Sequence, residues 1–228
     1  MYILAIDTST DILGVALAKD KIVLAQQNVN IGRRHFEKVF PAINRALKRA
    51  RLSLKKIDLL AVALGPGSFT GMRIGVTIAK GLAFATGKPV VGVSTLDVIA
   101  KNILADDNDI CVVMDAKRNL LYGAIYEADG ALLKRKSPYL LIGIRDLLKR
   151  IKQRTIFVGD GLNLYQGLIQ KRKKALAVFA PASNWLPAAG NLALLAGERF
   201  KKEKNSDPNK LLPLYLYPKE CQIRNAKI

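Results

Sequence analysis

The segment over 65–75 combines glycine, proline and hydroxyl side chains in a pattern that could bind an anion. It reads Gly-Pro-Gly-Ser-Phe-Thr-Gly-Met-Arg-Ile-Gly and joins a predicted strand over 57–64 to a predicted helix over 71–86. Its glycines permit backbone angles that other residues avoid, and Ser68 or Thr70 can cap the helix. A glycine-rich turn before a helix can hold an anion, but tight packing is its more common role. The segment is not a nucleotide-binding P-loop, because the spacing G-x-x-x-x-G-K-[ST] is absent.

Two aspartates close matching apolar runs in the two halves of the chain. Asp7 follows the run over 2–6, and Asp115 follows the run over 110–114. After each aspartate two predicted strands flank a short polar turn, at 13–18 and 22–27 and again at 121–127 and 131–136. The remaining predicted elements are helices over 33–50, 144–153 and 190–204 and strands over 89–93 and 155–158. The recurrence of strand, aspartate and hairpin in one order favours an internal duplication. By itself, an aspartate at such a position is most often a cap for the turn.

The chain is strongly basic. Lysine and arginine number 37 against 18 aspartate and glutamate residues, which gives a net charge of +19. Such a surface attracts nucleic acid or acidic partners, although charge alone carries no specificity. The basic residues are spread over both halves and cluster at 134–136, 149–154 and 171–174. The alternative interpretation is that they form solvated faces of helices and loops.

Composition limits the class of protein further. Only two cysteines are present and no C-x-x-C pair, which argues against a disulfide framework or a zinc site. No apolar run is long enough to span a membrane, and the first residues lack the pattern of a secretory signal. We therefore expect a cytoplasmic protein with a substantial core, formed by one large domain or two small ones.

The duplicated order resembles the superfamily of actin, Hsp70 chaperones and sugar kinases. The resemblance implies an α/β fold of duplicated actin-like (ribonuclease H-like) lobes, each a mixed sheet with three initial antiparallel strands flanked by helices. It divides the chain into an N-terminal lobe over 1–103 and a C-terminal lobe, with a C-terminal helix and tail, over 104–228. In that superfamily the two strand-end aspartates face each other across a cleft and organise Mg²⁺ and nucleotide phosphates.

A more specific resemblance, to the TsaB (YeaZ) family, covers nearly the whole chain and is strongest over 1–100. It is carried by the glycine-rich segment together with Ile3–Thr10, Gly92–Leu96, Met114–Ala116, Val158–Gly161 and Leu212–Leu216. The resemblance implies a subunit of the bacterial complex that makes N6-threonylcarbamoyladenosine in tRNA, on the adenosine 3′ of the anticodon. The implied partners are a TsaD-like catalytic paralogue, which the subunit binds and activates, a TsaE-like ATPase, and tRNA in the assembled complex.

The same resemblance implies that this subunit is not the catalyst. The catalytic paralogue carries an H-x-x-x-H metal pair after the last strand of its first lobe, whereas the segment over 93–99 holds no histidine and His35 is the only one in the chain. Relatives that bind ATP favour D-x-G-T in the first hairpin, where this chain has serine in place of glycine. We therefore expect no catalytic residue, no metal site and no cofactor. A degenerate nucleotide site remains as a candidate, formed by Asp7, Thr8, Ser9, Thr10 and Asp115.

The predicted helix over 71–86 is apolar around most of its circumference, since only Arg73 and Lys80 are charged. One face must cover the sheet, and a helix that is apolar all round is normally buried all round. We therefore predict that this helix and the one over 33–50 form a partner interface. Without the partner, the same surface should drive homodimerisation. The predicted interface residues are Phe36, Phe40, Ile43, Gly71, Met72, Gly75, Val76, Ala79, Leu82 and Ala83.

Two functions of other classes stay open at this point. One is a small ATP-dependent kinase or ATPase of the actin-like superfamily that uses Asp7 and Asp115. The other is a direct RNA-binding module driven by the basic charge. Titration with ATP separates the first from a non-catalytic subunit, and the salt dependence of tRNA binding tests the second.

Overall fold

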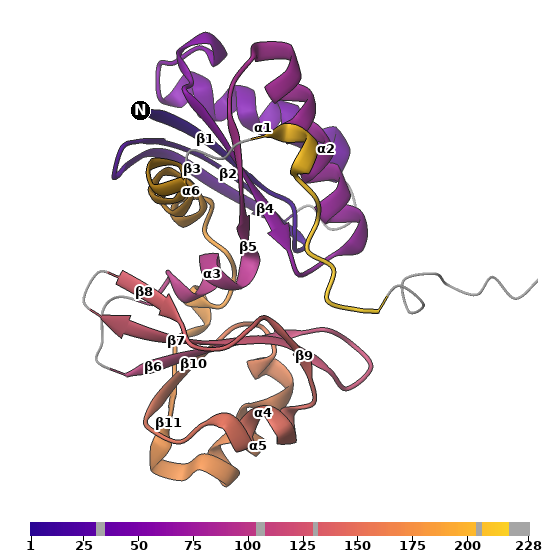
Figure 1. Cartoon of the computed structure of the whole chain (residues 1–228), viewed down its shortest axis with the longest axis vertical. Coiled ribbons are helices and arrows are strands. Elements are labelled where there is room, and N and C mark those ends of the chain that lie inside the picture. The colour runs from indigo at the N-terminus through magenta and orange to yellow at the C-terminus, as the bar shows by residue number, and fades with distance from the viewer. Residues whose placement is uncertain (31–34, 104–107, 130–131, 204–206, 219–228) are drawn as a thin grey trace, which may run out of the picture.

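The computed structural model describes residues 1–30, 35–103, 108–129, 132–203 and 207–218. The chain forms two lobes, each built on one mixed sheet, which lie one above the other in Figure 1. The duplicated α/β architecture predicted from the sequence is confirmed, because the two sheets share one strand order and one set of strand directions. In the described ranges no helix is both long and apolar enough to cross a membrane.

The sheet of the first lobe has the order β3-β2-β1-β4-β5. Neighbouring strands at the β3-β2-β1 end are antiparallel, whereas β1, β4 and β5 are parallel. Short polar turns connect the antiparallel strands, and helices connect the parallel ones, as parallel pairing requires. The strands are β1 (Tyr2–Asp7), β2 (Ile12–Lys19), β3 (Ile22–Asn30), β4 (Leu59–Gly65) and β5 (Val90–Ser94).

The sheet of the second lobe repeats this arrangement. Its order is β8-β7-β6-β10-β11, with β8, β7 and β6 antiparallel and β6, β10 and β11 parallel. A short additional strand, β9, pairs with β7. The strands are β6 (Asp109–Asp115), β7 (Leu121–Asp129), β8 (Leu132–Arg135), β9 (Leu140–Ile142), β10 (Thr155–Val158) and β11 (Ala177–Phe179).

Helices cover both faces of each sheet, because each central strand is buried on both sides. In β1, Leu4 and Ile6 pack in the core formed with α1 (His35–Arg49) and α2 (Phe69–Thr86). The alternate residue Ile3 packs against α6 (Ala189–Glu203) on the opposite face. In the second lobe α4 (Ile144–Arg150) and α5 (Leu162–Lys173) cover one face, and α3 (Thr95–Ala100) covers the other. Four short 3-10 helices complete the described elements: η1 (Leu54–Lys56), η2 (Lys174–Leu176), η3 (Ala182–Asn184) and η4 (Pro208–Lys210).

Each half of the chain supplies one helix that packs on the sheet of the other half. The predicted division into 1–103 and 104–228 therefore does not coincide with the hydrophobic cores. The last helix, α6, was assigned to the C-terminal lobe, but it packs on the first sheet, where Ala193 lies in the same core as Ala5. Helix α3 lies between the two sheets, since Val98 joins the first core and Leu96 joins the second. Figure 1 shows α6 returning beside the first sheet. The reason is that each sheet needs apolar cover on two faces, and the short α3 leaves one face of the first sheet open.

Candidate functional site

The glycine-rich segment packs directly against the loop that follows β1. A Cβ atom added at Gly67 would lie closer than 3.0 Å to the Ser9 carbonyl oxygen, and one at Gly71 equally close to the Thr8 carbonyl oxygen. A Cβ added at Gly75 would meet Thr8 Oγ1. The glycines therefore allow the two backbones to pack closely. Of the two roles considered for this segment, tight packing and anion binding, the structure supports tight packing.

Two hydrogen bonds fasten the two loops to each other. The Ser68 amide donates to the Ser9 carbonyl oxygen at 2.7 Å, and the Thr8 hydroxyl donates to the Gly71 carbonyl oxygen at 2.7 Å. Ser68 also caps α2, since its hydroxyl accepts from the Gly71 amide at 3.2 Å. Of the two candidate caps, Ser68 is therefore the one used. In the first loop, the amide and the carbonyl oxygen of Ser9 are both paired within the chain.

Asp7 lies at the bottom of this packed region with an exposed fraction of only 1%. One carboxylate oxygen accepts hydrogen bonds from the Ser9 amide at 2.8 Å and the Ser9 hydroxyl at 2.7 Å. The other oxygen is buried without a hydrogen-bond partner. Burial raises the pKa of Asp7 to about 6, although the hydrogen bonds from Ser9 act to lower it. The geometry is that of a turn cap in a dry site, and Ser9 fills the space beside the carboxylate.

Asp115 caps the matching turn in the second lobe. Its carboxylate accepts from the Lys117 amide at 2.8 Å and forms an ion pair with the Lys117 ammonium. Burial acts to raise the pKa of Asp115, but the hydrogen bonds and charge of Lys117 outweigh it and lower the pKa. The neighbouring Asp160 accepts a hydrogen bond from the Asp115 amide at 3.1 Å, and burial raises its pKa.

The turn after Asp115 has an unusual backbone. Lys117, Arg118 and Asn119 have φ values of 65°, 52° and 59°, in the left-handed region that residues other than glycine seldom occupy. The turn is closed by a hydrogen bond from the Ala116 amide to the Leu120 carbonyl oxygen at 3.1 Å. Two cationic residues, Lys117 and Arg118, therefore lie in the turn that follows Asp115.

The C-terminal strap, which we define as residues 211–217, crosses from the first lobe to this turn (Figure 1). The Leu214 amide donates to the Leu64 carbonyl oxygen at 2.8 Å, at the end of β4. Farther along, the Tyr217 hydroxyl donates to the Ala116 carbonyl oxygen at 2.9 Å, and its ring meets Tyr122 edge-on at 6.1 Å. The strap therefore joins the two lobes across the side where the two aspartate turns end.

An aromatic and cationic stack anchors the strap at the start of α2. The Arg73 guanidinium lies 3.9 Å from the Phe69 ring centroid, and Arg73 Nε donates to the Tyr215 hydroxyl at 2.8 Å. The Phe69 and Tyr215 rings are 5.3 Å apart. Arg73 thus belongs to an internal contact that stabilises the strap.

An inter-lobe cluster of Asp97, Tyr126, Tyr139 and Arg199 lies between the two sheets. The Asp97 carboxylate accepts from the Tyr126 and Tyr139 hydroxyls, each at 2.7 Å. It also pairs with the Arg199 guanidinium, which donates to the Gly92 carbonyl oxygen at 3.1 Å. Asp97 is 6% exposed, so this is a nearly dry contact that ties α3, α6 and β7 together. No local sequence pattern indicates this cluster, because the other members lie 29 to 102 residues from Asp97.

The predicted partner interface needs correction at the level of single residues. Most of its members are buried in the chain's own core: Ile43, Gly71, Met72, Gly75, Val76, Ala79 and Ala83. The small residues of α2 face β4 and the first loop, because close packing there demands them. Leu82 is half-buried, and the side chain of Phe36 is outside the described part of the structure.

Other residues of the same two helices do face outward. Phe40 of α1 is 47% exposed and Phe84 of α2 is 63% exposed. Such large aromatic side chains rarely remain in water when a partner can cover them. The interface itself stays a prediction, and Phe84 replaces the glycine and alanine strip as its expected contact.

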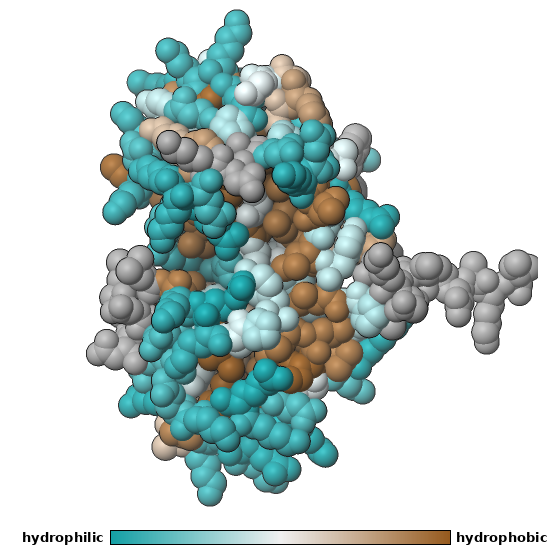
Figure 2. Space-filling view, viewed as in Figure 1, coloured by the Kyte–Doolittle hydropathy of each residue, from teal (hydrophilic) through white to brown (hydrophobic). Residues whose placement is uncertain are grey.

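The contacts of the site hold the two lobes and the two loops together. No group of three or more His, Cys, Asp or Glu side chains in the described ranges could hold a metal ion. The space-filling view in Figure 2 shows apolar surface gathered where the two lobes meet, next to the strap. The degenerate nucleotide site formed by Asp7, Thr8, Ser9, Thr10 and Asp115 stays a prediction.

Comparison with known proteins gives one consistent result. Residues 24–226 match the family described as TsaD, tRNA N6-adenosine threonylcarbamoyltransferase. The chain is 31% identical to the tRNA threonylcarbamoyladenosine biosynthesis protein TsaB of Bacillus subtilis, over 98% of this chain and 97% of that protein. It is also 31% identical to TsaB of Escherichia coli, over 95% of this chain and 94% of that protein.

A solved structure agrees with these relatives. YeaZ from Pseudomonas aeruginosa superposes with a TM-score of 0.80 at 25% identity, covering 94% of this chain and 99% of that one. The similarity in sequence therefore extends to the arrangement of both lobes.

Proposed function

Since the chain belongs to the TsaB (YeaZ) family of tRNA threonylcarbamoyladenosine biosynthesis proteins, we propose that it serves this pathway as a non-catalytic subunit. Its partner is a TsaD-like catalytic paralogue, which it binds and activates. A TsaE-like ATPase and the tRNA substrate join the assembled complex, which works in the cytoplasm. Without the paralogue, the chain forms a homodimer through the same surface.

The packing of the glycine-rich segment on the first loop carries this proposal. In an actin-like enzyme that loop must open its backbone amides to phosphate, and a glycine at the third position makes room for the ligand. Here Thr8 and Ser9 have no exposed surface, and their carbonyl groups contact Gly71 and Gly67. Opening the loop would break the two hydrogen bonds that join it to the glycine-rich segment, each worth about 1 kcal/mol net. We infer a loop kept for structure after its nucleotide chemistry was lost.

The inter-lobe cluster supports the same proposal. In the catalytic paralogue the segment after the last strand of the first lobe carries a pair of histidine metal ligands. Here that segment begins α3 and supplies Asp97, whose two oxygens are taken by Tyr126, Tyr139 and Arg199. The position thus holds the lobes together and leaves no ligand facing outward for a metal ion.

Co-purification with the TsaD-like paralogue is the experiment that tests the proposal. Each protein alone and the two together are assayed for threonylcarbamoyladenosine formation with tRNA, the ATPase and the other substrates present. We expect a stable pair, no product from this chain alone, and far more product from the pair than from the paralogue alone. Product made by this chain alone would contradict the proposal.

Titration of the isolated chain with Mg-ATP tests the competing ATPase function. We expect no binding tighter than on the order of 100 μM, about −5.5 kcal/mol. Low-micromolar binding that disappears in Asp7→Ala would favour the enzyme instead.

A further inference from the structure

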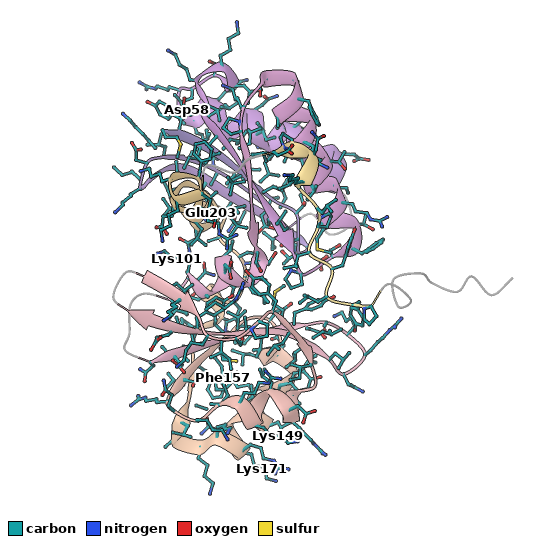
Figure 3. The ribbon with its side chains drawn as sticks, in the orientation of Figure 1. Asp58, Lys101, Lys149, Phe157, Lys171 and Glu203 are labelled. Carbon is teal, nitrogen blue, oxygen red and sulfur yellow. The ribbon has the colours of Figure 1, made fainter. Side chains whose placement is uncertain are left out.

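The fold brings two basic runs together at the end of the second lobe that lies farthest from the first. Segment 144–176 contains nine lysine and arginine residues and only two aspartates, an excess of seven within a chain whose total is +19. One run closes α4 and continues over 149–154, and the other closes α5 over 171–174. Figure 3 shows Lys149 and Lys171 at this same end of the lobe, on two different helices.

Direct contacts hold the two runs side by side. The Lys173 ammonium donates to the Ile151 carbonyl oxygen at 2.8 Å, which fastens the end of α5 to the end of α4. Beneath them, Leu148 and Ile169 lie in one hydrophobic core. The basic residues therefore stand on a rigid base that folding has already ordered.

A pocket of about 370 Å³ lies beside these runs. Its polar lining comes from Asp109, Lys136, Ser137, Arg150, Lys152 and Gln153. Asp109 is the acidic member, and both of its oxygens are paired with the Lys136 ammonium at 3.0 Å. Arg150 and Lys152 also line the pocket, and no ion pair within 4.0 Å joins either of them to an acid among the described residues.

Charge in this region is left largely unbalanced. Within the described part of the lobe's far end, the ion pairs are Lys149 with Asp146 and Lys136 with Asp109. None joins an acid to Arg154, Lys171 or Arg172, all of which are exposed. Like charges held close on an ordered surface repel one another, so the arrangement favours a polyanion that relieves the repulsion. We define Arg150, Lys152, Arg154, Lys171, Arg172 and Lys174 as the far-end basic patch.

We propose that the far-end basic patch binds the phosphate backbone of tRNA. This inference rests on the proposed function, which supplies tRNA as the polyanion present in the complex. The partner surface on α1 and α2 belongs to the other lobe, so one chain can contact the paralogue and the tRNA at the same time. Phosphate contacts of this kind position a nucleic acid without reading its sequence.

An anionic membrane is the other polyanion to consider, and the surface fits it poorly. A helix that lies in a membrane interface needs an exposed apolar face beside its basic one. On α5, Leu162 and Ile169 are buried in the lobe's own core, and among the described residues of this helix Leu164 is the large aliphatic side chain left exposed, which does not make an apolar face. Figure 2 shows a hydrophilic surface over most of this end of the molecule.

Charge reversal tests the patch on the full-length chain. The variant Lys152→Glu/Lys171→Glu/Arg172→Glu changes three exposed residues of the patch. The matched control Lys21→Glu/Lys56→Glu/Lys201→Glu makes the same change in net charge on exposed residues of the first lobe. Binding of one transcribed tRNA is followed by fluorescence anisotropy over a series of salt concentrations, and thermal unfolding verifies that both variants are folded.

For the unmodified chain we expect weak binding that falls steeply with salt. The patch variant should bind on the order of tenfold or more weakly at low salt, and its slope of log K against log salt should fall by about 2–3, since each lost phosphate contact contributes about 0.7–0.9. The control variant should keep most of the affinity at low salt and most of the salt slope. Equal losses in the two variants would mean that only total charge matters, and no loss in the patch variant would place the contact elsewhere. Either result overturns the proposal, as would stronger patch-dependent binding to vesicles of anionic phospholipid than to tRNA.

Failure of the patch and failure of the proposed function give different results. If the patch is wrong but the function holds, the patch variant still pairs with the TsaD-like paralogue and the pair binds and modifies tRNA normally. If the function is wrong, the unmodified chain does not pair with the paralogue, whatever its affinity for tRNA.

Discussion

Asp7 and Asp115 make the same hydrogen bond in the two lobes: each carboxylate accepts the backbone amide two residues later at 2.8 Å. Both residues end the first strand of a sheet, so the duplication extends to this capping contact. Their surroundings differ, however. Asp7 is buried beside Ser9 with a raised pKa, whereas Asp115 is paired with Lys117 and has a lowered pKa. The two aspartates should therefore affect stability in opposite directions as the pH changes.

The first prediction concerns Asp7→Asn. The pKa of Asp7 is about 6 in the folded chain and near 3.8 when unfolded, so between these values the folded state binds more protons. Its ionisation therefore lowers the free energy of unfolding as pH rises through this window, by up to about 3 kcal/mol. Asparagine does not ionise. We expect the stability of the variant relative to the unmodified chain to rise between pH 4 and about 6 and then level off, as measured by urea unfolding.

Asp115→Asn serves as the matched comparison. Because the pKa of Asp115 is lowered by Lys117, its contribution to stability is present above the unfolded pKa and is lost as pH falls through the folded one. This variant should be less stable than the unmodified chain at neutral pH, and the difference should vanish in acid. The same pH trend in both variants would contradict the different environments of the two aspartates.

The second prediction uses two helical glycines. Gly75→Ala should destabilise the chain by about 2 kcal/mol or more, because its Cβ would collide with Thr8 Oγ1 in the packed loop. Gly167→Ala in α5 should instead stabilise by about 0.5–1 kcal/mol, because an added Cβ would meet no atom within 4 Å beyond the backbone of its own helix, and alanine favours the helix. Denaturant midpoints measure both. A tolerated alanine at position 75 would mean that the two loops are not tightly packed.

Much of the fold could be predicted from the sequence, because local patterns determined it. The strand over 2–6 and the strands of the hairpin after each aspartate show continuous or alternating apolar residues, and these patterns have nearly the same lengths as the strands of the structure. Helix α5 was missed, since its apolar residues do not all lie on one face: Leu162 and Ile169 are buried, whereas Leu164 is exposed. The packing of α6 on the first sheet was also missed, because sequence order gave no sign that the chain returns to its first lobe.

The candidate site was predictable only in part. Glycine spacing identified the segment over 65–75, with close packing and anion binding both left open. Serine in place of glycine at position 9 favoured a degenerate nucleotide site, which stays a prediction. The sequence did not reveal which face of α2 points inward, because both faces are apolar, and Val76 proved to be core while Phe84 is exposed. The contact between Arg73 and Tyr215 joins residues 142 positions apart, which no local pattern predicts.

The third prediction concerns the inter-lobe cluster. Tyr126 is 1% exposed, and its hydroxyl is bonded to Asp97 at 2.7 Å. Tyr126→Phe should cost about 1–3 kcal/mol of stability, because it leaves a buried carboxylate oxygen short of a donor. Tyr139→Phe should cost less, since the oxygen that Tyr139 bonds also pairs with Arg199. Thermal unfolding of both variants checks this order. Equal losses of stability would show that Arg199 does not compensate for the hydrogen bond of Tyr139.

A fourth prediction separates residues that fold the chain from residues that bind the partner. Val76 is 4% exposed in the core between α2 and the first sheet. Val76→Glu would bury a charge without a partner, so it should cost about 3 kcal/mol or more and lower the yield of folded protein. Loss of pairing in this variant therefore says nothing about the interface, and circular dichroism should show the unfolding directly.

Phe84→Glu is the informative change on the same helix. Phe84 is 63% exposed, so the substitution should leave the melting temperature of the isolated monomer nearly unchanged. A specific interface buries on the order of 1,200–2,000 Å², and a charge inside it without a partner disrupts binding. We expect Phe84→Glu to abolish both the homodimer, measured by analytical ultracentrifugation, and co-purification with the TsaD-like paralogue. A folded Phe84→Glu chain that still pairs and still supports tRNA modification would show that the partner binds another surface.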